Sequence, residues 1–333
     1  MNKNKITLID ALYINQGGGK VLLDLLIESL SKNNDIYYLL DNRISKSYPF
    51  LNKNVTYLKS SIISRHYFYL LNKNKFSNVL CFSNIPPSVN LKCMVYTFFQ
   101  NVNLLNKSSN SFEIFFKRFY IKYFQRNSDK WIVQTNVVSK LINGIGVDES
   151  NIFILPFFKE VSFDLIKKNN NKIKFLYVSS GEKHKNHIRL FNSFKKYFSL
   201  NNNTELTVTV DDNYNDLCDK ISYFQSINIP IINKGFISHE MIKEEYKKAD
   251  FFIYPSLHES FGLGLIEACQ FNLPIISSDR SYVYEIVNPN LTFDPVSENS
   301  ILESMIKSID YINLKGELKI KNKLSNIIDL ITK

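Results

Sequence analysis

The chain has 333 residues, of which 44% are apolar, and this is enough for two domains that each bury a core. Lysine and arginine together number 41 and aspartate and glutamate 31, so the formal charge is 41 − 31 = +10. This composition excludes wholesale disorder. The basic excess, mostly lysine, indicates an anionic partner such as a diphosphate, an acidic membrane surface or a nucleic acid.

The N-terminal stretch favours a cytoplasmic protein. Its apolar run is interrupted by Asp10 and no small-residue cleavage site follows, so we predict no signal peptide. No apolar run approaches the roughly 18 residues that span a membrane, so we expect at most a peripheral position on the inner face of the cell membrane. The cysteines form no close pair and are expected to be reduced and mostly buried, at positions 81, 93, 218 and 269.

In the first half, short β-branched and aromatic runs alternate with segments of helical period, which is the pattern of repeated βαβ units. Helices are predicted over 20–30 and 112–125. Strands are predicted over 6–10, 35–40, 55–58, 79–82, 94–98, 130–134 and 152–155.

A second series of strands begins directly after the polar stretch 167–172, which we interpret as a domain boundary. The predicted strands are 173–178, 205–210, 229–233, 251–254 and 274–277. The predicted helices are about 186–198, 214–224, 238–248 and 263–270, followed by 298–311 and 316–331. The whole pattern predicts an α/β protein with two Rossmann-like, doubly wound parallel-sheet domains that face a central cleft.

Gly17, Gly18 and Gly19 follow the first strand and open a helix, so backbone amides there could approach an anion. The string is not a Walker A loop, because Lys20 is followed by Val21 rather than by Ser or Thr. A tight turn without a ligand explains the glycines equally well at this point.

The segment 249–279 holds the strongest functional signal. Glu259 lies on a loop after a buried strand, and Glu267 lies about one turn inside the next helix, roughly 6 Å further along its axis. Between them, residues 262–264 offer free amides and the positive end of the helix dipole to a diphosphate. Ordinary helix capping is the alternative reading of these carboxylates.

The segment PSLHESFGLGLIEACQFNLPIISSD resembles the signature of the retaining GT-B glycosyltransferases of family 4, also called group 1 glycosyltransferases, in which two Glu residues flank seven others. Further resemblance lies in FLYVSSGEKHKN, KGFISHEMIKEEYKKAD, LTFDPVSENSILESMIK and, upstream, KWIVQTNVVSKLINGIGVDESNIFILP. It covers most of residues 130–310 and is thinner before them.

The resemblance implies a GT-B fold with an acceptor domain over 1–160, a nucleotide-sugar domain over 171–312, and a last segment, 313–333, that packs back on the first domain. It implies that Glu267 binds the nucleotide ribose, Glu259 a donor-sugar hydroxyl, and Lys185 the diphosphate, with Glu259 and Lys185 as the catalytic pair. The other implied donor contacts are Gly18, Gly19, Gly235, Phe236, Ile237, Phe261, Gly262 and Leu263.

Three positions depart from the family pattern. Ser180 stands where many members carry an arginine, so Lys183 or His184 would have to supply that charge. The histidine that many members have near FFQN is missing, which leaves Gln100 and Asn101 as weaker candidates for sugar or acceptor contact. Ser260 replaces the glycine that usually follows the first glutamate.

The resemblance implies a retaining enzyme that transfers a sugar from a nucleotide diphosphate sugar to a glycan acceptor, lipid-linked, in bacterial surface polysaccharide synthesis of the O-antigen or capsule type. We expect no metal, no cofactor and no nucleic-acid partner, because Lys185 and helix amides suit the diphosphate charge. A nucleotide-sugar hydrolase or epimerase and a basic nucleic-acid-binding protein are the alternatives.

The segments 57–76 and 111–126 interleave aromatic and basic residues. As amphipathic helices they could rest on an anionic membrane surface, which would be a further partner. A core-facing aromatic stripe with solvated basic residues explains the same pattern.

Overall fold

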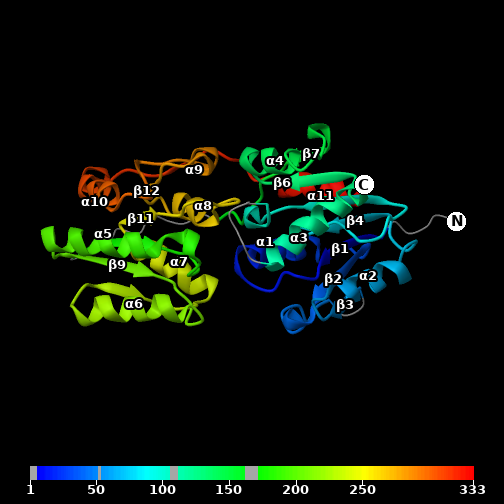
Figure 1. Cartoon of the computed structure of the whole chain (residues 1–333), viewed down its shortest axis with the longest axis horizontal. Helices are drawn as coiled ribbons and strands as arrows, with labels where there is room; N and C mark the ends of the chain where they lie inside the picture. The colour runs from blue at the N-terminus through cyan, green and yellow to red at the C-terminus, as the bar shows by residue number, and fades with distance from the viewer. Residues whose placement is uncertain (1–5, 52–53, 106–111, 162–171) are drawn as a thin grey trace. The chain divides into compact units, whose positions relative to one another are not determined.

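The computed structural model describes residues 6–51, 54–105, 112–161 and 172–333 (Figure 1). The chain divides into two compact units. Unit 1 comprises residues 1–159 and 321–333, and unit 2 comprises residues 160–320. The predicted boundary stretch 167–172 lies outside the described residues except for Lys172.

The described part of unit 1 is built on a seven-stranded parallel sheet in the order β3-β2-β1-β4-β5-β6-β7. The order reverses between β1 and β4, which is the doubly wound pattern that the sequence predicts. Its strands are β1 (Thr7–Ala11), β2 (Ile36–Asp41), β3 (Val55–Leu58), β4 (Asn78–Cys81), β5 (Met94–Phe98), β6 (Lys130–Val133) and β7 (Ile152–Ile154). Its helices are α1 (Gly17–Leu30), α2 (Ile62–Leu71), α3 (Phe112–Phe124), α4 (Asn136–Asn143) and α11 (Leu324–Thr332).

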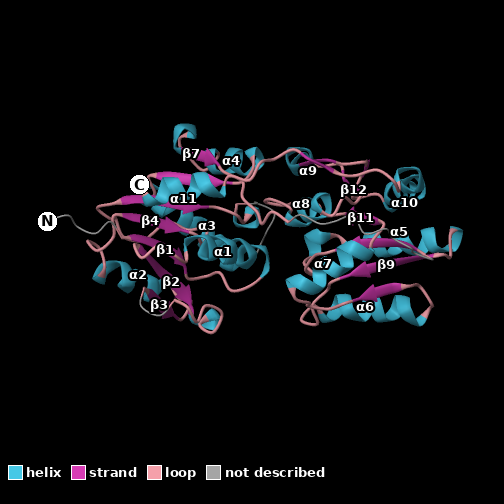
Figure 2. Cartoon of the chain, turned by 180° about the vertical axis from the view of Figure 1, so that it is seen from behind, coloured by secondary structure: helices cyan, strands magenta, loops and turns pink. Residues whose placement is uncertain are grey.

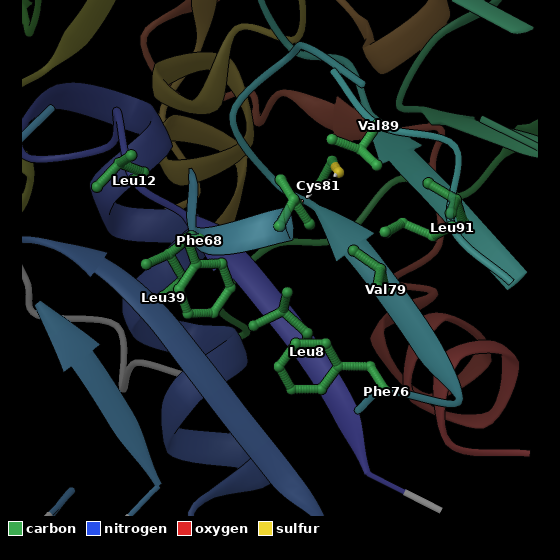
Figure 3. Packing of buried hydrophobic residues seen from close by; sticks show 11 residues of the cluster. Leu8, Leu12, Leu39, Phe68, Phe76, Val79, Cys81, Val89 and Leu91 are labelled. Atoms are coloured by element: carbon green, nitrogen blue, oxygen red, sulfur yellow. Dashed lines mark hydrogen bonds between the residues drawn. The ribbon is translucent and has the colours of Figure 1, made fainter. Parts of the chain in front are cut away.

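The core of unit 1 lies between its sheet and its helices. Leu8 of β1 and Leu39 of β2 pack with Phe68 of α2 and with Val79 of β4, as Figure 3 shows. Phe68 stacks on Phe76 with 6.2 Å between ring centroids. One face of α2 is therefore fixed on the sheet by apolar packing.

Unit 2 repeats this architecture in a described six-stranded parallel sheet of order β10-β9-β8-β11-β12-β14 (Figure 2). Its strands are β8 (Ile173–Tyr177), β9 (Thr204–Val208), β10 (Ile231–Asn233), β11 (Phe251–Tyr254), β12 (Ile275–Ser278) and β14 (Leu291–Phe293). Its helices are α5 (His187–Leu200), α6 (Asn215–Ser226), α7 (His239–Lys248), α8 (Leu263–Gln270), α9 (Ser281–Ile286) and α10 (Glu298–Lys307). A small antiparallel pair joins β13 (Val287–Asn288) to β15 (Glu317–Leu318).

The predicted helix over 316–331 is wrong in its first half. β15 occupies Glu317–Leu318, and the helix α11 begins only at Leu324. The backbone amide of Lys319 donates to the carbonyl of Ile286, and that of Lys323 donates to the carbonyl of Pro156. These tertiary hydrogen bonds replace the local i to i+4 bonds that a helix would need, so the tertiary context overrides helical propensity.

The helix α11 lies in unit 1. The hydroxyl of Thr7 and the amide nitrogen of Asn78 both donate to the carbonyl of Ile331, at 2.8 and 3.0 Å. The side chain of Asn322 donates to the carbonyl of Phe158 at 2.9 Å. Polar contacts at both of its ends thus hold the last segment of the chain on β1, β4 and the region after β7.

Candidate functional site

The strand order of unit 2 reverses between the neighbouring strands β8 and β11. The loops after these two strands therefore leave the same edge of the sheet at a topological switch point, where doubly wound proteins bind ligands. The first loop carries Lys185 at the end of a short 3₁₀ helix, and the second carries Glu259. The fold thus brings together two candidate residues that lie 74 positions apart.

Lys185 and Glu259 form an ion pair, with the lysine Nζ 2.7 Å from the glutamate Oε1. The two side chains are only 15% and 10% exposed, so the pair is largely shielded from water. The hydroxyl of Tyr177 on β8 donates to the carbonyl of Lys185 at 2.9 Å, which ties the loop to the sheet. The carbonyl of His184 accepts from the amide of Leu257 at 2.8 Å, which ties the two loops to each other.

The helix α8 begins directly after the second loop. Gly262 precedes it with φ +71°, a left-handed conformation that side-chain-bearing residues rarely adopt. Its first turn contains no acidic residue and receives no cap from a described side chain. The amides of Gly262, Leu263 and Gly264 are thus placed at the positive end of the helix, where an anion is stabilised.

The missing side chain of Gly264 also allows close packing. A Cβ atom there would lie 3.1 Å from Cζ of Phe252 and 3.4 Å from Cε2 of Tyr254, so a larger residue would crowd the contact between α8 and β11. Phe261 is 5% exposed. The backbone of Phe261, rather than its buried side chain, is therefore available for the predicted donor contact.

Glu267 lies one turn inside α8. The residue keeps some accessible surface, but its carboxylate is enclosed by protein, and this burial raises the pKa of Glu267 to about 7. The hydroxyl of Tyr246 on α7 donates to its Oε2 at 2.9 Å and partly offsets that effect. Glu267 is therefore a hydrogen-bond acceptor whose ionised form is destabilised by burial in the ligand-free protein.

The rings of His184 and His258 stack beside the ion pair, with 4.7 Å between centroids and 18° between planes. Burial lowers the pKa of both histidines, and the positive charge of Lys185 lowers them further. His184 is therefore neutral at pH 7. This makes it a poor substitute for the cation that is missing at Ser180.

The side chain of Ser180 contacts a carboxylate on the same loop. The hydroxyl of Ser180 donates to Glu182. Burial opposes ionisation of Glu182, but hydrogen bonds from Ser180 and Tyr214 outweigh it, so that the pKa of Glu182 is lowered. Lys183 is exposed beside it and remains the candidate for compensation.

The loop 235–237 follows β10 and leaves the same edge of the sheet as the two loops above. Gly235 has φ +67°, and its backbone amide donates to Oδ1 of Asn233 at 3.1 Å. The side chain of Phe236 is 78% exposed, whereas Ile237 is half-buried. An exposed aromatic ring at this edge suits stacking on a flat base.

In unit 1, the glycines that begin α1 lie close to the segment after β5. A Cβ atom on Gly19 would lie 3.3 Å from the Nε2 atom of Gln100, so the two predicted residues are close neighbours. Gln100 is held by two hydrogen bonds, from its amide to Oδ1 of Asn84 at 2.7 Å and from its Nε2 to the carbonyl of Phe82 at 3.2 Å. Asn101 instead accepts from the amide of Asn103 and caps the 3₁₀ turn that follows.

Two supporting residues received no role from the sequence, although Tyr246 lies within the resembling segment 234–250. Tyr246, which bonds to Glu267, and Asn84, which holds Gln100, each lie far from their partners in the chain. A tyrosine in a helix and an asparagine after a strand carry no signal by themselves. Only the packing of the elements shows what they contact.

The family comparison decides the assignment. Residues 158–318 match the family model described as glycosyl transferases group 1, and this stretch is almost the whole of unit 2. Unit 2 is therefore a group 1 glycosyl transferase domain. The matched stretch includes Lys185, Glu259, Gly262 and Glu267.

The chain is similar to curated proteins of known name. The O-antigen chain mannosyltransferase RfbU of Salmonella typhimurium is 28% identical over 215 residues, which is 60% of this chain and 57% of that protein. The chain therefore matches less than two thirds of the length of this relative.

Solved structures share the fold at low identity. A sucrose-phosphate synthase from Thermosynechococcus elongatus has a TM-score of 0.74 at 13% identity and covers 99% of this chain and 95% of its own. HepE of Anabaena, solved with UDP and glucose, has a TM-score of 0.70 at 10% identity, over 92% of this chain and 90% of that one. The fold is the GT-B fold that the sequence predicts.

Among the described residues, no three His, Cys, Asp or Glu side chains gather closely enough to hold a metal ion. Within the same ranges, the structure has no helix with the length and apolar character to cross a membrane.

Proposed function

We propose that this glycosyl transferase moves a sugar from a nucleotide diphosphate sugar to a glycan acceptor with retention of the anomeric configuration. The observation that carries the proposal is the constellation in unit 2, where the Lys185–Glu259 pair and Glu267 flank the glycine-led start of α8. A cation, free helix amides and two carboxylates are the groups that a diphosphate, a ribose and a sugar require.

In this proposal, the diphosphate lies against Lys185 and the amides of Gly262 and Leu263. The ribose hydroxyls donate to the carboxylate of Glu267, and a hydroxyl of the transferred sugar donates to Glu259. The base lies beside the loop 235–237. As the bond from the sugar to the diphosphate breaks, negative charge builds on the leaving phosphate, and Lys185 with the helix amides stabilises it. These groups would supply that charge without a metal.

In unit 1, we propose that Gly18 and Gly19 contact the donor. Gln100 and Asn101 contact the sugar or the acceptor. The acceptor we propose is a lipid-linked glycan of a bacterial surface polysaccharide, and the enzyme works as a peripheral protein on the inner face of the cell membrane. The similarity to an O-antigen chain mannosyltransferase supports this choice.

Thermal shift against UDP-, GDP- and dTDP-sugars tests the donor site, with mannosyl and glucosyl donors first. A donor at about 100 times its Kd adds roughly 2.7 kcal/mol to the free energy of unfolding. We expect one nucleotide to raise the Tm of the wild type and to raise that of Lys185→Ala much less. No shift with any of these donors would overturn the assignment.

The stereochemistry and the reaction class need a second measurement. NMR of the isolated product is expected to show the same anomeric configuration as the donor. Donor turnover in the absence of acceptor, at the rate seen with it, would instead indicate a nucleotide-sugar hydrolase.

A further inference from the structure

Two helices of unit 1 expose apolar side chains that the donor site does not use. On α2, one face packs on the sheet through Phe68 and Tyr69, while the opposite face is apolar and exposed. The exposed residues of that face are each 47–84% accessible: Ile62, Ile63, Tyr67, Leu70 and Leu71. A soluble helix normally turns polar residues to this side.

The helix α3 shows the same departure. Ile121 is fully buried, whereas four aromatic residues on the other side are each 53–69% accessible: Phe115, Phe116, Phe119 and Tyr123. Phe119 and Tyr123 stack on each other with 6.1 Å between centroids, and Phe115 and Phe116 meet edge to face at 6.0 Å. For these described aromatic residues, the core-facing interpretation is therefore wrong.

Both helices lie on the same face of the sheet. The connections β3→β4 and β5→β6 cross the sheet in the same direction, and right-handed crossovers then place α2 and α3 on one side. Their contacts agree, because Arg65 of α2 and Tyr120 of α3 both donate to the carbonyl of Pro86. We call the nine exposed apolar residues of these helices the two-helix surface.

The charges around the two-helix surface are almost all positive. Residues 57–76 contain no Asp or Glu, and residues 112–126 contain a single one, Glu113. Six exposed basic residues accompany them, Lys59, Lys73, Lys75, Lys117, Lys122 and Arg126. Exposed aromatic and aliphatic side chains among lysines and arginines are the composition that binds the headgroup region of an anionic bilayer.

We propose that the two-helix surface rests in the headgroup layer of an anionic membrane. A second copy of this chain fits the surface less well, because a symmetric dimer would bring two positive rims together. This inference rests on the proposed function, because the acceptor proposed there is linked to a membrane lipid. The first turns of α2 and α3 lie at the carboxyl edge of the sheet, where Gln100 also lies, so a lipid-linked acceptor would enter from the bilayer at that edge.

Flotation of the full chain with vesicles tests this directly. The probes are vesicles of phosphatidylglycerol with phosphatidylcholine, and vesicles of phosphatidylcholine alone. The interface variant is Ile63→Gln with Phe119→Gln, because glutamine is a good helix former and both residues are exposed. The matched control is Leu200→Gln with Tyr223→Gln, at two equally exposed positions on α5 and α6 of unit 2.

We expect the wild type and the control to float with anionic vesicles at low salt and the interface variant to bind at least tenfold more weakly. Replacing Lys122 and Arg126 by glutamine should weaken binding about fivefold for each charge removed, and high salt should do the same. Thermal shift by the donor should be unchanged in all of these variants, which separates this inference from the donor-site assignment.

Equal flotation of the interface variant and the control would overturn the proposal. Recovery of the wild type in the unbound fraction with anionic vesicles at low salt would overturn it too. Sedimentation equilibrium of the same proteins tests whether the two-helix surface instead forms a dimer. A wild-type dimer that the interface variant abolishes, without any vesicle binding, would assign the two-helix surface to a second copy of the chain.

Discussion

Replacing Glu267 by glutamine should stabilise the protein without ligand and weaken donor binding. The substitution keeps the shape of the side chain and an oxygen that can accept the hydrogen bond from Tyr246, but it removes a charge enclosed by protein. Burial of that charge raises the pKa of Glu267 from 4.5 to about 7. The same charge is the group that we assign to the ribose.

The pKa shift of Glu267 determines how large the effect on the free energy of unfolding is and over which pH range it occurs. Because the folded protein holds this proton more tightly than the unfolded chain, its stability falls as the pH rises from about 4.5 to about 7 and then stays level. At 1.36 kcal/mol per pKa unit, the wild type loses about 3 kcal/mol over that window, and Glu267→Gln does not. The variant should therefore be more stable by about 3 kcal/mol at pH 8 and by almost nothing at pH 4.5.

Urea unfolding at pH 4.5, 6 and 8 measures the difference, with Glu244→Gln as the control because Glu244 is 56% exposed on α7. The control should stay within about 0.5 kcal/mol of the wild type at each pH. Donor affinity should fall at least tenfold in Glu267→Gln, since a hydrogen bond to a charged group contributes about 1.5–3 kcal/mol. A variant that is no more stable than the wild type at pH 8, or whose gain does not shrink toward pH 4.5, would refute the reasoning.

Three further substitutions probe the rest of the structure. Lys185→Ala should lower kcat at saturating donor by about 10²-fold or more; near-normal turnover would contradict the assigned role. Gly262→Ala should cost about 1–2 kcal/mol in urea unfolding, because its φ of +71° is left-handed, and an unchanged midpoint would disprove this. Arg65→Met should cost about 3–5 kcal/mol, because it leaves the buried Asp10, now 2.7 Å from the arginine, without its countercharge. Adding Asp10→Asn should recover part of that loss, and strict additivity of the two changes would count against the pair.

Much of the fold was predictable because most of the longer strands are short buried runs with their own local signal. The strand Phe251–Tyr254 and the helix over 263–270 begin and end where the sequence places them. The helix over 316–331 was mispredicted because its first residues make their hydrogen bonds to Ile286 and Pro156, which are distant in the chain. A local pattern contains no information on such partners.

The candidate site shows the same division. The spacing of Glu259 and Glu267 around a glycine-led helix start is local, so it was visible in the sequence. The pairing of Lys185 with Glu259 and the bond from Tyr246 to Glu267 depend on how the loops after β8 and β11 and the helix α7 come together. The exposure of the aromatic residues on α3 was likewise undecided until packing showed which face the sheet covers.

The ion pair between Lys185 and Glu259 has a consequence for selectivity and product release. In the structure each group neutralises the other. If Lys185 binds the diphosphate as we propose, a lone phosphate would separate the pair and leave Glu259 shielded from water without a countercharge. A nucleotide sugar would offset that separation through both its diphosphate and its sugar hydroxyl. After transfer of the sugar, the nucleotide diphosphate would keep only the first contact, so re-formation of the ion pair would favour its departure.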